Sequence, residues 1–332
     1  MPPHVAPVVV SRIKVMARLD IAERRVPQDG RIGLTLGGKL IDVRVSTLPS
    51  RAGERVVLRI LDKENAGISL DLLGMSDETL RLLSDALAEP NGIILVTGPT
   101  GSGKTTTLYA GLKQLNDGKR NILTVEDPVE YAVEGVGQTQ VNAKVGMTFA
   151  AGLRAILRQD PDVVMVGEIR DVETAQIAVQ ASLTGHLVLS TVHTNDAVGA
   201  ITRLRDMGVE PFLLASTVRL IVAQRLVRRL CTHCRAPAAD EGYGKHWRAP
   251  GCTECRHTGY VGRIGLYEAV VVDEAMRRLI GANADEDALA ASAFARGTRL
   301  ADAARDAVAR GETSLEEAIR ISRADLEDDA GV

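Results

Sequence analysis

The chain has 332 residues, 45% of them hydrophobic, and a formal net charge of −3. Because a single hydrophobic core stops growing at roughly 250–300 residues, we expect at least two globular units. The small net charge gives no overall attraction to polyphosphate or anionic lipid. No apolar run approaches the roughly 18 residues of a membrane helix, and Val5–Val10 is too short for a signal peptide, so we expect a cytoplasmic protein.

The first part of the chain predicts a small α+β module. Apolar residues between Ile13 and Ile21 lie near helical spacing among Arg and Lys, which indicates an amphipathic helix ending near Arg25. From residue 31 the pattern alternates around two glycines, which indicates a hairpin and one further strand. We therefore expect residues 1–64 to form this module and residues 65–75 to form a linker.

Residues 76–228 are expected to form a nucleotide-binding α/β core. Short apolar runs alternate with helical patterns, which is typical of a parallel sheet. Four runs are followed directly by polar residues, in the segments IILVTGPTGSGKTT, ILTVEDPVE, VVMVGEIRD and LVLSTVHTND. Ligands of open parallel sheets bind beyond the carboxyl ends of the strands, so one site accounts for all four segments.

The first of these segments completes the phosphate-binding motif GxxxxGK[ST] between a strand and a helix, the context that the motif requires. Its glycines let backbone amides approach the phosphates, Lys104 reaches the terminal phosphates and Thr105 ligates magnesium. No guanine-reading NKxD motif is present, so ATP is the expected nucleotide. The expected phosphate-binding residues are Gly98, Pro99, Thr100, Gly101, Ser102, Gly103, Lys104, Thr105 and Thr106.

A phosphate-binding loop of this type needs acidic groups for the metal and for the attacking water. Glu126, Asp127 and Glu130 follow the second apolar run, and Glu168 follows the third run in the place of a Walker B acid. The two acidic clusters can divide the metal-binding and general-base roles. For Glu126 and Asp127, a structural role as helix cap or ion-pair partner is an equal alternative.

All four cysteines lie in two CxxC pairs with seventeen residues between them. In a cytoplasmic chain this spacing indicates a tetrahedral zinc site rather than disulfides, with four unligated thiols as the alternative. The segment from Leu226 to Glu268 has seven Lys or Arg against four Asp or Glu. This small excess of positive charge is not enough for a nucleic-acid binding surface. We expect zinc binding in an insertion of residues 229–258, followed by a strand and helices over residues 259–332. The expected ligands are Cys231, Cys234, Cys252 and Cys255.

Together these segments resemble the motor ATPases that drive type II secretion and type IV pilus assembly. The resemblance runs from about Ser11 to beyond Glu268. It is carried by GPTGSGKTT, ILTVEDPVEY, DPDVVMVGEIRD, TGHLVLSTVHTNDA and AQRLVRRLC. The segments LRAILRQDPD, QASLTGHL and ITRLRDMGVEPFLLAST are most similar to the E-component branch of type II secretion, with the pilus-extension branch as the alternative.

The resemblance implies a RecA-like core with a PAS-like N-terminal module, and it implies roles for individual residues. Glu130 matches the general base, and Glu168 matches an atypical Walker B glutamate that binds magnesium. His186 and His193 bracket the last apolar run and match a histidine box, where they are expected to sense the γ-phosphate. The arginines that would compensate phosphate charge, with surface ion pairing as the alternative, are Arg44, Arg59, Arg154 and Arg158.

The resemblance also implies a homo-hexamer that uses ATP hydrolysis to act on an inner-membrane platform protein and to move pseudopilin subunits. Such a motor is cytoplasmic and is held peripherally at the inner membrane by docking proteins, without nucleic acid. Family members generally carry a further N-terminal docking domain, so we expect either a fragment or docking supplied by another chain. Two alternatives stay open: a nucleic-acid translocase on the same core, and a subunit that binds ATP without turnover.

Overall fold

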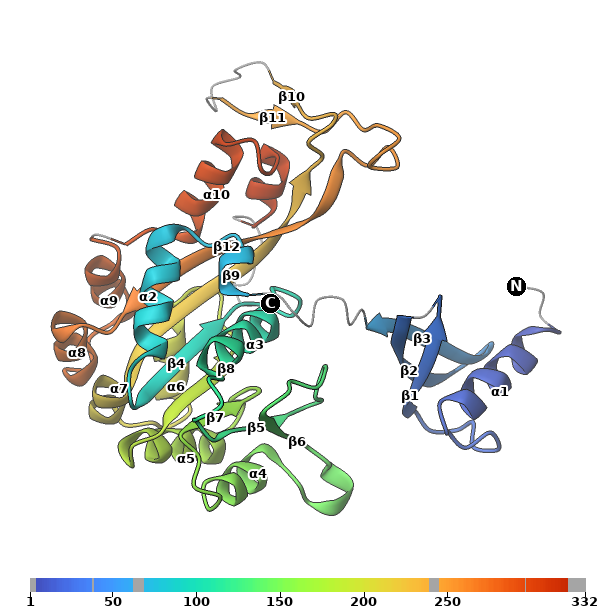
Figure 1. Ribbon diagram of the computed structural model, residues 1–332, viewed down its shortest axis with the longest axis horizontal. Coiled ribbons are helices and arrows are strands. Elements are labelled where there is room, and N and C mark those ends of the chain that lie inside the picture. The colour runs from blue at the N-terminus through green and yellow to red at the C-terminus, as the bar shows by residue number, and fades with distance from the viewer. Residues whose placement is uncertain (1–3, 38, 62–68, 239–244, 296, 322–332) are drawn as a thin grey trace. The chain divides into compact units, whose positions relative to one another are not determined.

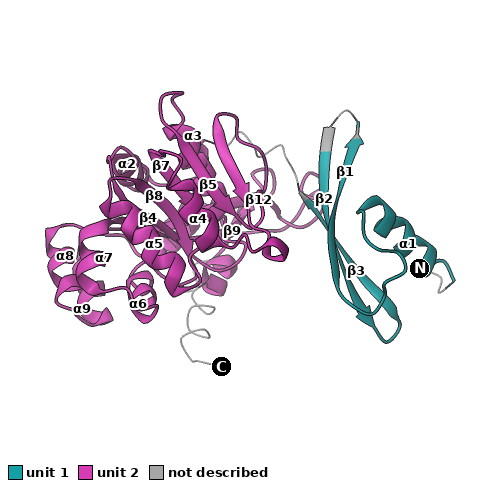
Figure 2. Ribbon diagram, turned by 90° about the horizontal axis from the view of Figure 1, so that it is seen from below, with its two compact units in different colours: residues 1–67 teal, residues 68–332 magenta. Residues whose placement is uncertain are grey.

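The computed structural model describes the chain in five segments, and it divides the chain into two compact units, residues 1–67 and 68–332 (Figure 2). The predicted linker over residues 65–75 lies partly outside the described residues. The described segments are residues 4–37, 39–61, 69–238, 245–295 and 297–321.

The described part of the smaller unit contains one helix and a three-stranded antiparallel sheet in the order β1-β2-β3, so it has the predicted α+β composition. The hairpin between β1 and β2 turns between Leu36 and Lys39, where the alternating pattern predicted it. Buried Ala17, Ile32 and Val45 belong to its core. The elements are α1 (Ala6–Met16), β1 (Gln28–Leu36), β2 (Lys39–Ser50) and β3 (Gly53–Leu61).

Helix α1 ends at Met16, so the prediction that it continues to about Arg25 is wrong. Arg18 adopts a left-handed φ of 56°, and the Leu19 amide donates to the Lys14 carbonyl at 2.8 Å, which closes the helix. Leu19 still packs against the core. The apolar spacing continues past the end of the helix because Leu19, although not helical, is also packed against the core.

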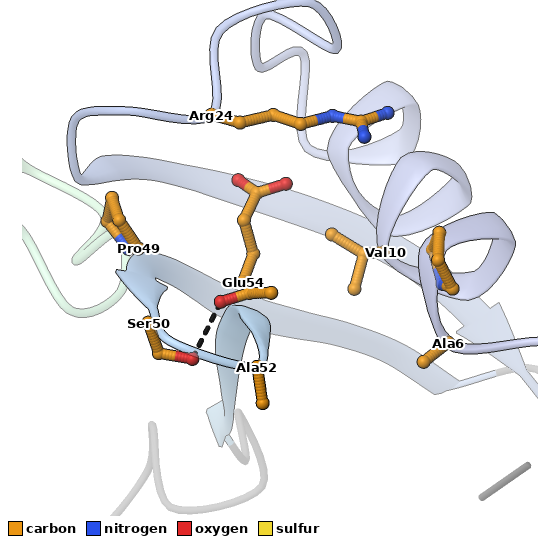
Figure 3. Close-up of a pocket in the computed structure, with 9 residues that line it drawn as sticks. Ala6, Val10, Arg24, Pro49, Ser50, Ala52 and Glu54 are labelled. Atoms are coloured by element: carbon orange, nitrogen blue, oxygen red, sulfur yellow. Dashed lines mark hydrogen bonds between the residues drawn. The ribbon is translucent and has the colours of Figure 1, made fainter. Parts of the chain in front are cut away.

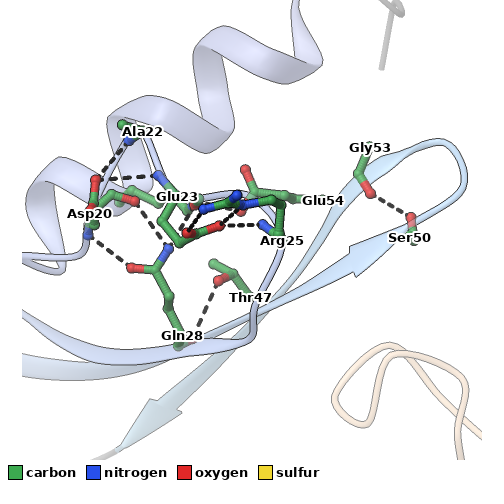
Figure 4. Close-up of polar contacts among 10 residues, drawn as sticks. Asp20, Ala22, Glu23, Arg25, Gln28, Thr47, Ser50, Gly53 and Glu54 are labelled. Atoms are coloured by element: carbon green, nitrogen blue, oxygen red, sulfur yellow. Dashed lines mark hydrogen bonds and ion pairs between the residues drawn. The ribbon is translucent and has the colours of Figure 1, made fainter.

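A buried ion pair joins α1 to the sheet. Lys14, whose side chain is 1% exposed, pairs with the Glu54 carboxylate, and its Nζ donates to the Glu23 carbonyl at 2.7 Å. The Gln28 side chain donates to the carbonyls of Asp20 and Glu23, which fixes the loop between α1 and β1 (Figure 4).

The smaller unit also has a pocket of about 260 Å³ beside α1 and the β2–β3 turn (Figure 3). Its walls are mainly small apolar side chains, among them Ala6, Val10 and Ala52. The charged residues of its lining are Arg24 and Glu54, and Glu54 already pairs with Lys14. The pocket contains none of the predicted nucleotide-binding residues.

The larger unit is built on a seven-stranded sheet in the order β12-β9-β4-β8-β7-β5-β6. All neighbours in it are parallel except β12, which runs antiparallel to β9. The four predicted apolar runs are strands β4, β8, β7 and β5, side by side at the centre. The strands are β4 (Gly92–Thr97), β5 (Ile122–Glu126), β6 (Val136–Gln140), β7 (Val163–Val166), β8 (Leu187–Val192), β9 (Val218–Leu230) and β12 (Tyr260–Val271).

Helices cover both faces of this sheet (Figure 1). Ile93 and Leu95 of β4 lie in one core, whereas Ile94 and Val96 lie in the other. Burial on both faces explains why the central strands read as continuous apolar runs. The helical elements are η2 (Leu70–Leu72), α2 (Asp77–Leu87), α3 (Lys104–Leu115), η3 (Ala143–Val145), α4 (Phe149–Ile156), α5 (Val172–Leu183), α6 (Gly199–Asp206), α7 (Pro211–Thr217), α8 (Glu274–Gly281), α9 (Glu286–Ala293) and α10 (Leu300–Ala309).

Among its described residues, the insertion between β9 and β12 has little regular structure of its own. It contains the two-residue strands β10 (Ala236–Pro237) and β11 (Trp247–Arg248), which pair antiparallel. At its base, Arg228 forms an ion pair with Glu317 at 2.9 Å. Across the described residues, the helices are too short or too polar to span a membrane.

Candidate nucleotide-binding site and cysteine cluster

The predicted phosphate-binding loop joins β4 to α3 at the carboxyl edge of the sheet. Gly98, Gly101 and Gly103 have φ angles of 142°, 83° and 92°, which favour glycine. A Cβ added at Gly98 would lie 2.4 Å from the Gln224 carbonyl oxygen, whereas one at Gly101 would meet nothing within 4 Å. The loop therefore packs tightly against β9 on one side and is open at Gly101, where a phosphate can approach its backbone.

Gln224 of β9 packs against this loop. It is 2% exposed, and its Oε1 accepts a hydrogen bond from Thr107 Oγ1 of α3 at 2.7 Å. A Cβ added at Gly103 would lie 2.7 Å from Gln224 Nε2. This role of Gln224 could not be predicted from the sequence, because its partner Thr107 lies 117 residues away. The local pattern shows a single polar residue within an apolar run.

Lys104 begins α3 and is largely buried. Its Nζ donates to the carbonyls of Gly98 at 2.7 Å and Pro99 at 3.0 Å. Burial lowers the pKa of Lys104 to about 8; the Glu168 carboxylate opposes this shift and the Arg225 guanidinium adds to it. Lys104 and Glu168 therefore interact electrostatically at the same edge of the sheet.

We expect nucleotide binding at alkaline pH to take up a proton at Lys104. With a pKa of about 8, most of this lysine is neutral at pH 8.5, and phosphate charge favours its ammonium form. Binding should therefore take up roughly 0.7 proton at pH 8.5 and about 0.1 at pH 7. Isothermal titration calorimetry with ATP in two buffers of different ionisation enthalpy measures this uptake. Equal binding enthalpies in both buffers at pH 8.5 would contradict the lowered pKa.

Glu168 follows β7 and is 8% exposed. Its Oε1 lies 2.5 Å from Arg170 Nη2, and its Oε2 lies 3.2 Å from His193 Nε2. Because β7 and β8 are parallel neighbours, their carboxyl ends bring Glu168 and His193 together across 25 residues of sequence. Burial and Lys104 lower the pKa of His193, while Glu168 opposes them. The sheet thus gathers Lys104, Glu168 and His193 at one edge, and their chemical roles stay predictions.

The acidic residues at and after the end of β5 have two kinds of surroundings. Glu126 is 2% exposed and accepts hydrogen bonds from the Tyr109 hydroxyl, from Thr124 Oγ1 at 2.5 Å and from Gln138 Nε2 at 3.1 Å. These bonds favour the structural alternative for Glu126. Glu130 is half-buried, and its amide donates to Tyr109 Oη at 3.3 Å, which fixes its backbone near α3.

His186 does not lie at this edge, contrary to the expectation that both histidines sense one phosphate. It precedes β8, and its carbonyl accepts from the Gly92 amide at 3.2 Å, at the amino end of β4. Its Nδ1 lies 2.9 Å from the Ala181 carbonyl oxygen. The six residues of β8 lie between the two histidines, which are seven positions and therefore roughly 20 Å apart. Of the two histidines, His193 is therefore the one beside the phosphate-binding loop of the same chain.

Arg154 and Arg158 lie on and after α4, which leads to the amino end of β7. Arg154 Nη2 pairs with the exposed Glu173 carboxylate at 2.6 Å, and Arg158 Nη1 donates to the Arg154 carbonyl at 2.8 Å. Exposed pairs of this kind contribute little to stability, typically about 0–1 kcal/mol. Both contacts are with residues outside the phosphate-binding loop.

Arg44 and Arg59 belong to the smaller unit, where they lie directly opposite each other on β2 and β3. Arg31 of β1 is also in register with Arg44, so three arginines form a row across the sheet. Like charges at directly opposed positions are unfavourable unless an anion or acid offsets them. The sequence pattern did not reveal Arg31, because cross-strand register is set by the turns.

The four cysteines converge at the base of the insertion, with all Sγ atoms within 4.8 Å of one another. The Cys231–Cys252 and Cys234–Cys255 sulfur pairs are 3.9 Å apart, and the Cys252–Cys255 pair is 3.7 Å apart. A tetrahedral zinc ion with Zn–S bonds near 2.3 Å sets sulfur–sulfur distances at about 3.8 Å. The geometry of the cluster therefore fits zinc.

Two backbone amides favour the thiolate form within the cluster. Burial opposes ionisation of Cys255, but the amides of Cys252 at 3.1 Å and Gly259 at 3.2 Å donate to its Sγ. The pKa of Cys255 is lowered to about 6. Metals bind the thiolate form, so these amides prepare the site.

Comparison with known proteins decides the family. Residues 2–320 match the model of the family described as Type II/IV secretion system protein. The chain belongs to this family. It is 59% identical to Type II secretion system protein E of Aeromonas hydrophila, over 97% of this chain and 67% of that protein. It is 58% identical to Type II secretion system ATPase E of Vibrio cholerae, over 95% of this chain and 65% of that protein.

The chain thus spans about two thirds of the length of these secretion relatives. Among solved structures, it resembles the pilus retraction motor PilT with bound ADP, with 30% identity and a TM-score of 0.67 over 90% of this chain and 78% of that one. The Legionella pneumophila ATPase DotB has the same fold, with 24% identity, a TM-score of 0.68 and the same coverage of 90% and 78%. The predicted RecA-like fold and the resemblance to the type II secretion ATPase family are confirmed.

Proposed function

We propose that the chain is the motor that hydrolyses ATP for a type II secretion apparatus. The observation that carries this proposal is the meeting of Lys104, Glu168 and His193 beside the phosphate-binding loop in a chain of this family. Lys104 and the loop amides bind and orient the phosphates. Glu130 accepts the proton of the attacking water, a role that follows from the family resemblance.

We propose that Thr105 and Glu168 hold Mg²⁺ when nucleotide is bound. Hydroxyl and carboxylate oxygens suit this cation, which supplies charge neutralisation on the phosphates. The fit is supported by the exposure of Thr105 at the start of α3 and by the orientation of the Glu168 carboxylate between Arg170 and His193. Nucleotide and Mg²⁺ would therefore share this edge of the sheet.

We further propose a homo-hexamer in which arginines from one chain serve the nucleotide of a neighbour. Arg154 and Arg158 are exposed, and their contacts are with Glu173 of α5 and with the Arg154 carbonyl, so we assign them to a nucleotide held by a second chain. His186 lies at the amino end of β8. Arg44 and Arg59 would bind the phosphates with the forked geometry of guanidinium groups. In a ring of subunits, all these residues could contact the nucleotide of a neighbouring chain.

The cysteine cluster would bind structural zinc and fold the insertion around it. Inner-membrane platform and docking proteins would recruit the motor peripherally to the cytoplasmic face, where it drives pseudopilus assembly. The names of the secretion relatives favour this assignment over a pilus-extension ATPase. The small charge excess of the insertion argues against a nucleic-acid translocase.

Steady-state hydrolysis by chains of known oligomeric state tests the proposal. We expect turnover in ATP-dependent hexamers, no stimulation by DNA, and at least a roughly 10-fold loss when Arg44 and Arg59 are both changed to Ala. The exposed Arg51 of the β2–β3 turn provides the control, because Arg51→Ala should leave turnover unchanged. DNA-stimulated turnover would instead support the translocase. Verified hexamers without turnover would contradict hydrolysis by this chain alone.

A further inference from the structure

Glu268 is a buried carboxylate that the proposed chemistry does not use. It lies on β12 and is 3% exposed. It pairs with Ala223 of β9, and Ala223 pairs with Thr97, the last residue of the strand that enters the phosphate-binding loop. Side chains at paired positions of neighbouring strands point to the same face of a sheet. Glu268 therefore lies on the face to which Thr97 points, two strands away.

The two oxygens of Glu268 bind two different segments. Oε1 accepts from the Ala197 amide at 3.0 Å, and Oε2 accepts from the Leu300 amide at 3.0 Å. Ala197 lies near the end of the loop that follows β8, and Leu300 is the first residue of α10. One carboxylate thus joins this loop directly to a helix of the C-terminal part of the chain.

The loop in question, residues 193–198, starts at the nucleotide site. Its first residue is His193, which contacts Glu168. Its second residue is fixed to the phosphate-binding strand, because the Thr194 amide donates to Thr97 Oγ1 at 2.9 Å. Glu268 holds the far end of the same short segment. A movement of His193 or Thr194 can therefore reach Glu268 through a single short segment of backbone.

The middle of the loop is braced as well. Arg225 Nη2 donates to Asn195 Oδ1 at 3.3 Å, and the Gly199 amide donates to Asp196 Oδ1 at 2.7 Å. With both ends and the middle bonded, the loop is suited to move as one body rather than to bend locally. Such a movement would be passed on to any group bonded to its far end.

We propose that Glu268 is a positioning residue that couples the nucleotide site to α10. Nucleotide-dependent movement of residues 193–198 would be passed through the Ala197 amide, the Glu268 carboxylate and the Leu300 amide to the first turn of α10. The effect on turnover rests on the proposed ATPase function, whereas the coupling itself can be measured with bound nucleotide alone. A carboxylate that only capped α10 would stabilise the helix without affecting the nucleotide site.

Glu268→Gln tests this inference, because it keeps the shape but leaves one amide facing an NH₂ group instead of an oxygen. We expect kcat to fall about 10-fold while the KM for ATP changes less than about 3-fold, since geometry rather than binding is disturbed. Combining Glu268→Gln with His193→Ala should lower kcat no further than the worse single variant. Additive losses would overturn the proposed route through His193.

Glu317→Gln provides the matched control. Glu317 is also a buried carboxylate, 2% exposed, and it accepts from the Arg228 amide at 2.9 Å, but it lies at the base of the insertion. We expect this variant to lose thermal stability while its kcat stays within about 2-fold of wild type. Equal losses of kcat in Glu268→Gln and Glu317→Gln would reduce Glu268 to a structural role and overturn the proposal.

Amide hydrogen exchange measures the coupling without turnover. A non-hydrolysable ATP analogue should slow exchange in residues 193–198 and in residues 300–305 of the wild-type chain. In Glu268→Gln the slowing should stay confined to residues 193–198. Slowing that still reaches α10 in this variant would refute the coupling. A wild-type chain that binds the analogue but never hydrolyses ATP would refute the proposed function alone, and the exchange result would still decide the inference.

Discussion

Glu168→Gln is expected to lower ATP turnover by at least about 100-fold and to leave ATP affinity within about 3-fold of wild type. The amide keeps the shape of the carboxylate, but it removes the charge that faces Lys104 and pairs with Arg170. In its proposed role the carboxylate would hold the Mg²⁺ that neutralises charge on the transferring phosphoryl group, so its loss should raise the energy of the transition state more than that of the bound ground state. Steady-state turnover measures the first effect, and titration with a fluorescent nucleotide measures the second.

Two further variants make this result specific. Lys104→Ala should lose affinity and turnover together, because the lysine is expected to contact the phosphates in both states. Glu78→Gln removes an exposed acid in the first turn of α2 and should change neither quantity. Turnover of Glu168→Gln close to wild type would show that the acid of this site lies elsewhere, with Glu130 as the next residue to change.

The central sheet and the phosphate-binding loop could be predicted from the sequence because each leaves a local signal. Strand β4 alternates its side chains between two cores, so Ile93 to Val96 form an unbroken apolar run. The phosphate-binding motif follows directly, and its glycines are required by backbone geometry within the loop itself. Glu168 and His193 could be placed for the same reason, since each follows the carboxyl end of a parallel strand.

Other site features could not be predicted, because they depend on strand ends and on cross-strand register. His186 and His193 lie at opposite ends of β8, roughly 20 Å apart, and the sequence motif that they share does not indicate this separation. Glu126 ends β5, whereas Glu168 lies just beyond β7, and the Tyr109 hydroxyl makes Glu126 part of a buried network. Glu268 lies within the strand predicted after the insertion, but its partners come from α10 and from the loop after β8.

The insertion that contains the cysteine cluster also contains a fluorescent residue, Trp247. Trp247 is the single tryptophan of the sequence and lies on β11, within the insertion. The Arg235 guanidinium lies 5.1 Å from its ring centroid, and a Cβ added at Gly311 would meet its indole at 2.6 Å. Its fluorescence therefore reports the packing of the insertion separately from the nucleotide-binding core.

Cys255→Ser is expected to abolish zinc binding and to unfold the insertion while the core still binds ATP. The described residues of the insertion form only two-residue strands, and a structural zinc ion contributes on the order of 10 kcal/mol to such folds. We expect zinc content, measured by plasma mass spectrometry, to fall from one ion per chain to near zero, with a red shift of Trp247 emission. His233→Ala, an exposed change between two of the cysteines, should retain both signals. Emission unchanged by a strong chelator would refute a structural zinc ion here.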